Sequence, residues 1–287
     1  ALGELVAEKS GMLNLGVEGM MAISAAVGFV VTYQTGSHIL GFAIAAVAGI
    51  IVSLIFALVS ITFLANQVAT GLAVGILSLG VSALIGKKYE SLTISAPEPI
   101  FIAGLSEIPF IGPVFFQQNI VVYGTVLIAI LIALCLNKTR LGLAIRACGE
   151  NPKAAEALSY SVWKIRYGAV AFGGMMAGFA GAYASTVYTP LWADGMIAGR
   201  GWIAVALVVF GTWKTSRIFL GAYLFGMVTL GELVVQSLGF AVPSQFLTAL
   251  PFVITIVVLA IISADMSRLR LHAPYSLGET YDGSEPQ

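Results

Sequence analysis

The sequence contains few charged residues. Over 287 residues only 10% are charged, whereas 59% are hydrophobic, and the mean hydropathy is +0.96. This composition excludes an ordinary soluble domain. The 14 basic and 14 acidic residues cancel, so no basic excess indicates a nucleic-acid partner. Several apolar runs exceed the roughly 20 residues that a helix needs to cross a bilayer, which indicates that membrane lipid surrounds the chain.

Cysteine and histidine are also scarce: the chain has Cys135 and Cys148, and His38 and His272. Neither a disulfide framework nor a metal-ligand spacing follows from them, and no catalytic group or cofactor is expected. A phosphate-binding loop is missing too, because Gly86-Lys87-Lys88 lacks the first glycine and the hydroxyl that such a loop needs. The sequence therefore predicts that the chain is not an enzyme and does not bind ATP through that motif.

Eight apolar segments determine the predicted fold. Polar, glycine-containing or proline-containing connections separate them, and they are residues 20–33, 39–64, 68–85, 120–136, 167–188, 201–213, 218–238 and 246–262. We predict an all-α polytopic membrane protein, in which residues 1–270 form one transmembrane domain and residues 271–287 form a polar, mobile C-terminal tail. Residues 1–6 read as the middle of an element, and we expect a further span upstream.

Two glycine-rich breaks precede short apolar runs. One is LNLGVEG, residues 13–19, and the other precedes segment 201–213, which at about 1.5 Å per residue covers only about 20 Å. That segment is either a thin crossing or a half-helix. A weak gapless repeat at an offset of about 180 aligns Gly19 with Gly199. Paired short segments are typical of a transport site near the bilayer midplane. A sequence built from few types of apolar residue also produces such matches by chance.

A polar segment, residues 138–166, interrupts the apolar sequence and holds six of the fourteen Lys and Arg residues. Positive charge between membrane spans marks the cytoplasmic side. Within it, Asn151-Pro152 predicts the start of a short helix, because the Asn side chain caps free N–H groups and Pro fits the first helical position. Such a helix is too short and polar to span. It either docks a soluble partner or belongs to an ordinary positive-inside loop.

Polar and aromatic residues near the spans are candidates for a substrate path: Glu18, Asn66, Gln67, Thr70 and Trp202. The three at positions 66, 67 and 70 share a helical face by their spacing, where they can hydrogen-bond an uncharged ligand or join neighbouring helices. Glu18 either lines a polar pathway or caps a helix N-terminus. Trp202 either offers an aromatic surface to a ring or belongs to the interfacial aromatic belt.

Four stretches carry a resemblance that covers nearly the whole chain: ALGELVAEKSGMLNLGVEGMM, NQVATGLAVGILSLGVSALIG, RLGLAIRACGENPKAAEALS and GRGWIAVALVVFGTWK. The chain resembles membrane permease subunits of ATP-binding-cassette (ABC) importers of the branched-chain amino acid, ribose and nucleoside group. It is most similar to the nucleoside branch, which works with a lipoprotein of the basic-membrane-protein family. The LNLGVEG stretch differs from the GIDLSVG pattern of ribose-type relatives.

The resemblance implies an importer in the bacterial cytoplasmic membrane, with two permease subunits that in this branch usually differ. It also implies a separate ATPase subunit and an extracytoplasmic substrate-binding lipoprotein. By the resemblance, the coupling loop that docks on the ATPase contains Glu150, Asn151, Pro152, Ala154 and Ala155. Small residues, a few amides and some aromatics suit a nucleoside, which carries no charge. Importers of sugars or branched-chain amino acids remain alternatives. So does a self-contained secondary carrier or channel, although sparse intramembrane charge argues against ion coupling.

Overall fold

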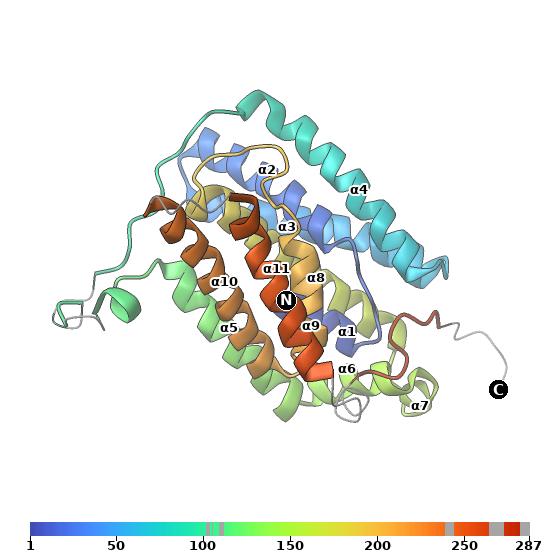
Figure 1. Ribbon diagram of the computed structural model, residues 1–287. Helices are drawn as coiled ribbons and strands as arrows, with labels where there is room; N and C mark the ends of the chain where they lie inside the picture. Colours follow the sequence, from blue (N-terminus) through green and yellow to red (C-terminus); the bar gives the residue numbers. More distant parts are fainter. Residues whose placement is uncertain (102–103, 105, 109–111, 239–243, 264–272, 282–287) are drawn as a thin grey trace.

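The structure is a computed structural model that describes residues 1–101, 104, 106–108, 112–238, 244–263 and 273–281. This described chain is built of helices without strands (Figure 1), as the sequence predicts. The long helices are α2 (Val17–Thr35), α3 (His38–Ala57), α4 (Gln67–Gly86), α5 (Ile120–Lys138), α8 (Val162–Tyr183), α10 (Thr215–Ser237) and α11 (Ser244–Ser263). The short helices are α1 (Leu2–Lys9), α6 (Arg140–Glu150), α7 (Pro152–Ala157) and α9 (Arg200–Phe210). Single π-helical turns extend α3 and α8, at Leu58–Thr62 and Ala184–Tyr188.

Each of the eight predicted apolar segments contains a helix. Among the described residues, six helices are long and apolar enough to cross a membrane, namely α2, α3, α4, α5, α8 and α10. Segment 201–213 forms α9, whose 11 residues cover about 16 Å at the usual helical rise. It is therefore a half-helix rather than a thin crossing. The polytopic all-α prediction is confirmed, and α1 adds one further short helix at the N-terminus.

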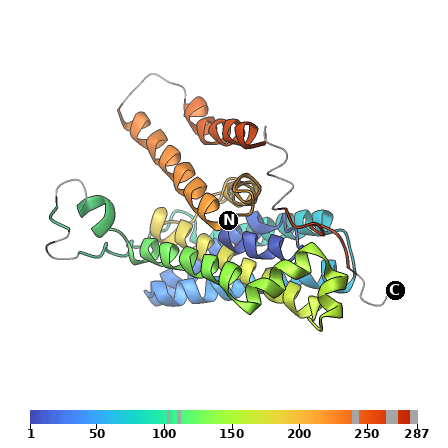
Figure 2. The same ribbon diagram turned by 90° about the horizontal axis from the view of Figure 1, so that it is seen from below.

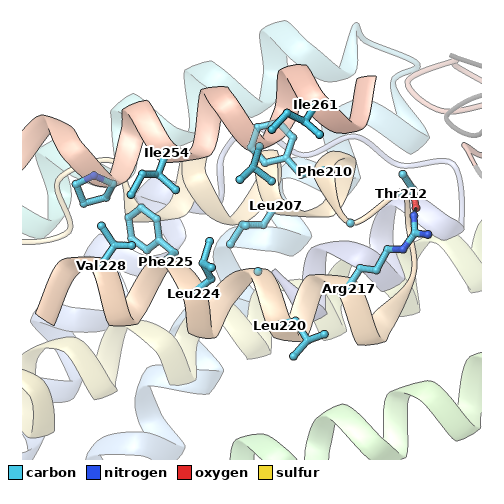
Figure 3. A pocket seen from close by; sticks show the side chains of 14 residues that line it. Leu207, Phe210, Thr212, Arg217, Leu220, Leu224, Phe225, Val228, Ile254 and Ile261 are labelled. Carbon is cyan, nitrogen blue, oxygen red and sulfur yellow. Dashed lines mark hydrogen bonds between the residues drawn. The ribbon is translucent and has the colours of Figure 1, made fainter. Parts of the chain in front are cut away.

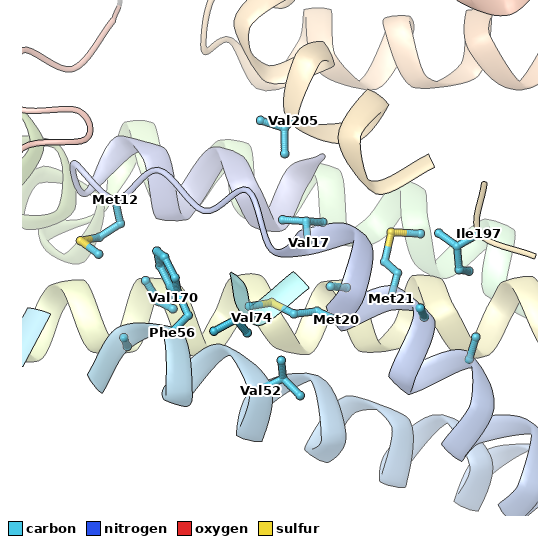
Figure 4. Close-up of a cluster of buried hydrophobic side chains, with 14 of the residues drawn as sticks. Met12, Val17, Met20, Met21, Val52, Phe56, Val74, Val170, Ile197 and Val205 are labelled. Carbon is cyan, nitrogen blue, oxygen red and sulfur yellow. The ribbon is translucent and has the colours of Figure 1, made fainter. Parts of the chain in front are cut away.

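The core lies where α2, α3 and α8 pack against one another (Figure 4). Met20 of α2, Val52 and Phe56 of α3, and Val170 of α8 are buried together in it. Lipid tails are as apolar as these side chains, so burial from water does not favour helix pairing within the bilayer. Close packing and hydrogen bonds between helices must hold this core together.

Glycine allows the core helices to approach closely. A methyl group added at Gly49 of α3 would collide with the backbone of Gly174 in α8, and one at Gly19 of α2 would collide with the backbone of Gly75 in α4. Serine adds hydrogen bonds between helices. For example, Ser82 of α4 donates from Oγ to a backbone carbonyl of α2 (2.7 Å). Small residues and polar groups thus hold these helices together, as is common in membranes.

Helices α10 and α11 stand away from this core (Figure 2). The membrane-crossing part of α2 is 67% buried, whereas that of α10 is 6% buried. At the gapless offset of about 180, α2 aligns with α9 and the turn that follows it. The aligned helices have 19 and 11 residues, so the weak repeat is not matched by helices of equal length.

Candidate functional site

The polar segment 138–166 folds into α6 and α7, which lie between the long helices α5 and α8. Asn151 caps α7, because its Oδ1 accepts a hydrogen bond from the N–H of Ala154 (3.0 Å). Pro152 occupies the first helical position, where it needs no hydrogen-bond partner. The predicted helix start at Asn151-Pro152 is therefore confirmed.

Helix α7 buries one side and exposes the other. Ala155 is buried against Cys148 and Val162, whereas Leu158, directly after the helix, is 71% exposed. A leucine exposed among polar residues is available for contact with a partner. Of the five residues that the resemblance assigns to the coupling loop, Ala155 is buried and Pro152 is half-buried. The other three are exposed, namely Glu150, Asn151 and Ala154.

The described C-terminal residues 273–281, which belong to the predicted polar tail, pack against this polar segment. The backbone N–H of Ser276 donates to the carbonyl of Gly149, near the end of α6 (2.9 Å). The hydroxyl of Tyr281 hydrogen-bonds to the carboxylate of Glu156 in α7. Polar composition predicts mobility, whereas in the structure these residues make long-range hydrogen bonds. The remainder of the predicted tail lies outside the described residues.

Glu18 joins the core helix α2 to the half-helix α9. Its two carboxylate oxygens accept from the N–H groups of Gly199 and Gly201, each at 2.7 Å. Because a helix N-terminus carries unpaired N–H groups and the positive end of the dipole, a carboxylate is stabilised there. Of the two roles that the sequence left open, the geometry fits capping, and the capped helix is α9 rather than Glu18's own helix.

The predicted polar face at the start of α4 is divided between two environments. Asn66 is exposed, and its side-chain oxygen caps α4 (3.0 Å). Gln67 is buried and bridges two segments: Oε1 accepts from the N–H of Leu13 (2.7 Å), and Nε2 donates to the carbonyl of Glu279 (3.0 Å). Thr70 is buried too. Gln67 therefore joins segments of this chain, but neither Leu13 nor Glu279 belongs to a helix, so these bonds are not the interhelical ones of the alternative reading.

Trp202 lies on α9 with 58% of its surface exposed, so it faces away from the core. Trp213 is buried instead, and its Nε1 donates to the carboxylate of Glu8 in α1 (2.6 Å). Glu4, one turn earlier, is buried and accepts from the N–H of Asn14 (3.1 Å). The sequence reasoning missed this network. Two carboxylates four residues apart in an apolar stretch were its signal, because such groups need partners inside a membrane.

Two cavities in the described part of the chain bear on the candidate site. One of about 520 Å³ lies between α9, α10 and α11 (Figure 3), and its lining is apolar except at the end formed by Thr212 and Arg217. There Arg217 Nη1 donates to Thr212 Oγ1 (2.7 Å). Because a nucleoside needs polar groups around its base and ribose, this lining suits it poorly. The second cavity, about 320 Å³, lies beside α7 and is lined in part by Glu156, Arg166 and Tyr281.

These features define a multi-spanning helical membrane protein that exposes a capped helix between two long helices. The chain belongs to the family described as branched-chain amino acid transport system/permease component, which matches residues 1–262. It is thus a permease subunit of an ABC transporter. The family and the helices of spanning length also confirm a multi-pass protein of the bacterial inner membrane.

Three relatives match over most of their length. The putative glucose ABC transporter permease protein TsgC13 of Haloferax volcanii is 38% identical over 98% of this chain and 92% of its own. The guanosine ABC transporter permease protein NupQ of Bacillus subtilis is 34% identical over 90% of this chain and 86% of its own. The nucleoside ABC transporter permease protein NupC of Lactococcus lactis is 32% identical over 91% of this chain and 86% of its own. No solved structure matches the chain.

Proposed function

We propose that this permease subunit imports nucleosides and is driven by a separate ATPase through the polar segment 138–166. The observation that carries the proposal is α7, which lies outside the spans and exposes Ala154, with Leu158 exposed directly after it. Asn151 and Pro152 fix its start, so its orientation is defined. When the ATPase dimer closes, it displaces α7 and switches the permease between its outward-open and inward-open forms.

The electrostatics of the half-helix support an uncharged substrate. The N-terminus of a broken helix often binds an anionic group of the substrate. Here the carboxylate of Glu18 already occupies that position on α9. A substrate that carries no charge, such as a nucleoside, needs no such site. Two of the relatives are named for guanosine and for nucleosides, which supports the same substrate class.

A sugar is the second candidate, because the relative from Haloferax volcanii is named as a putative glucose permease. Competition for uptake distinguishes the two. Labelled guanosine is supplied to cells that make the complete transporter, with excess adenosine, ribose, glucose or leucine. We expect adenosine to block uptake. If guanosine is not taken up and labelled glucose is, the nucleoside assignment is wrong.

We propose three partner chains for this permease: an ATPase, a second and different permease subunit, and an extracytoplasmic substrate-binding lipoprotein. Helix α10 is the least covered of the six spanning helices, so it offers the most surface to the second permease. Affinity purification of this chain from native membranes should recover all three partners. Uptake by this chain alone in liposomes, driven by an ion gradient, would instead show a secondary carrier.

Replacing Asn151 and Pro152 together by glycine tests the role of α7. The change removes the cap and the fixed first residue, so α7 loses its defined start. We expect uptake to fall about tenfold or more while the ATPase continues to hydrolyse ATP, as loss of a coupling free energy of typical size implies. The matched control is Asn119→Gly, which removes the N-cap of α5 and should leave uptake near the parent value. Unchanged uptake in the double variant would contradict the coupling role.

The side of the membrane on which α7 lies is checked separately. Lys153, an exposed residue of α7, is changed to cysteine in a chain that lacks both Cys135 and Cys148. In oriented vesicles, a membrane-impermeant maleimide should reach position 153 from the cytoplasmic face. Labelling from the opposite face would place α7 away from the ATPase and would exclude the proposed coupling.

A further inference from the structure

The C-terminal residues 273–281 bind elements that are far apart in the sequence. At the end of α6, Ser276 donates to the carbonyl of Gly149 from both its N–H (2.9 Å) and its Oγ (2.7 Å). In the loop between α1 and α2, the carbonyl of Gly11 accepts from the N–H of Gly278 (3.1 Å). In Figure 1 this red segment runs along the end of the molecule where α6 and α7 lie. It is therefore an integral part of that end of the fold.

Arg166, in the second turn of α8, is the buried charge around which the segment is arranged. Its Nε donates to the carbonyl of Ser10 (3.2 Å), and its Nη2 donates to Ser276 Oγ (3.3 Å). Its Nη1 donates to the carbonyl of Glu279 (3.4 Å), and the ring of Tyr281 lies 5.8 Å from the guanidinium carbon. Two of these three acceptors belong to the C-terminal segment. Because a buried charge without partners is costly, Arg166 stabilises the docked position of the segment.

The same segment also reaches α7 and α4. Tyr281 hydrogen-bonds to Glu156 of α7, and the carbonyl of Glu279 accepts from Gln67 at the start of α4 (3.0 Å). Gln67 in turn accepts from the N–H of Leu13 (2.7 Å). Helix α7 itself packs mainly on α6 and α8, which are its neighbours in sequence. The C-terminal segment therefore connects α7 to elements that do not adjoin it along the chain.

We propose that residues 273–281 form a C-terminal strap that positions α7 and transmits its displacement to α4 and to the loop between α1 and α2. This inference rests on the proposed function, in which α7 is the helix that the ATPase moves. A displacement of α7 moves Tyr281 through its bond to Glu156. Only one residue separates Tyr281 from Glu279, whose carbonyl is held by Arg166 and Gln67. Arg166 and Gln67 are thus positioning residues of the coupling pathway.

Cys148 reports whether the strap is docked. Its thiol is buried, and its backbone carbonyl accepts from Ser276 Oγ (3.4 Å). Burial raises the pKa of this thiol, which lowers the fraction of thiolate available to react with a maleimide. With Cys135 changed to serine, Cys148 is the one cysteine left in the chain. Its labelling rate, measured by mass in the complete transporter, therefore measures how often the strap opens.

The decisive variant is Tyr281→Phe, which removes the hydroxyl that meets Glu156 and keeps the ring beside Arg166. We expect Cys148 to label about tenfold faster, the change that loss of one hydrogen bond to a charged group implies for local opening. The matched control is Tyr275→Phe. The side chain of Tyr275 is 84% exposed, and its variant should label at the parent rate.

The second measurement is the number of substrate molecules taken up per ATP hydrolysed. In Tyr281→Phe and in Gln67→Ala this ratio should fall at least about fivefold, the lower end of coupling between distant sites, while the ATPase stays bound. In a chain that ends before Ala273, this ratio should fall further than in either point variant. Where that chain is not recovered as a folded complex, the two point variants decide.

If Tyr281→Phe keeps the parent labelling rate of Cys148, or the parent number of substrate molecules taken up per ATP hydrolysed, the strap proposal is wrong. The double glycine variant at Asn151 and Pro152 separates this outcome from failure of the proposed function. If that variant transports normally, α7 does not couple the permease to the ATPase, whatever the strap variants do. If it loses uptake while Tyr281→Phe and Gln67→Ala keep the parent ratio, coupling through α7 stands and the strap alone is wrong.

Discussion

Helices α2 and α10 have similar composition and opposite surroundings. Both are apolar and long enough to span a membrane, with 19 and 23 residues. Helix α2 is enclosed by α3, α4 and α8, and 67% of its membrane-crossing part is buried, whereas for α10 the value is 6%. Hydropathy therefore locates a span but does not tell whether protein or lipid surrounds it. The difference comes from how the small residues of each helix are used.

The glycines of the two helices show that difference directly. A methyl group at Gly19 of α2 would collide with the backbone of Gly75 in α4. At Gly226 and Gly231 of α10, an added methyl group would have no atom of the described residues within 4 Å. Small residues on a membrane helix allow another backbone to approach. In α2 that approach has taken place inside the chain, and in α10 the surface stays available to the second permease subunit that we propose.

The largest expected effect comes from a substitution in the enclosed region, where α3 packs against α8. Gly49→Leu places a side chain where α3 meets the backbone of Gly174 in α8, and the rigid backbone cannot move aside. We expect a loss of about 3 kcal/mol or more in the free energy of unfolding, at or above the upper end for overpacked cores. Size-exclusion chromatography in detergent should show little folded protein.

The matched control for Gly49→Leu is Gly226→Leu in α10, where no atom of the described residues lies within 4 Å of an added Cβ. This variant should be recovered as a folded chain with a thermal midpoint close to that of the parent. If α10 contacts the second permease, Gly226→Leu should instead weaken recovery of that partner on purification. A folding defect as large as that of Gly49→Leu would show that α10 is packed within the chain, and the contrast between the helices would fail.

A smaller effect is expected at the junction between the two regions. Glu18→Gln keeps the side-chain shape but replaces one carboxylate oxygen with an N–H donor, so either Gly199 or Gly201 loses its acceptor. We expect a cost of about 1.5–3 kcal/mol, as for a hydrogen bond to a charged group. Because the bond joins α2 to α9, the loss should free the start of α9 and leave the core folded.

Tryptic cleavage after Arg200, the first residue of α9, measures this local release. Glu18→Gln should be cut faster than the parent, while the core fragments stay resistant. Glu90→Gln is the control, because Glu90 is exposed on a connection outside the spans. Equal cleavage of Glu18→Gln and the parent would mean that other contacts hold α9 in place.

Much of the fold follows from the sequence, because membrane spans depend on local apolar length. All eight predicted segments contain helices, and the helix start at Asn151-Pro152 is confirmed, since a cap involves residues only three apart. The environment of each span was not predictable in this way. Burial of α2 and exposure of α10 depend on which helices meet, and a single sequence does not record that.

The candidate site shows the same limit. The exposure of Asn151 and Ala154 on a short helix agrees with the predicted docking segment. Glu18 and Gln67 were predicted only as alternatives, because their partners, Gly199 and Glu279, lie 181 and 212 residues away. For Arg166 the sequence predicts only a positive charge near the cytoplasm. Its burial depends on the C-terminal segment, whose polar composition gave no sign of docking.

The smallest expected effect is the loss of a single side-chain hydroxyl, which we compare between the enclosed helices and α10. Ser82 of α4 donates across to the carbonyl of Ala22 in α2 (2.7 Å), whereas Thr229 of α10 donates to the carbonyl of Phe225 in its own helix (3.0 Å). Ser82→Ala should cost about 0.6 kcal/mol, the average for hydrogen bonds between membrane helices, and should lower the thermal midpoint by about 1–2 °C. Thr229→Val should leave the midpoint unchanged, because that carbonyl keeps its helical hydrogen bond. A shift at Thr229 equal to that at Ser82 would show that α10 also depends on its polar groups for packing, and the two helices would then differ only in degree.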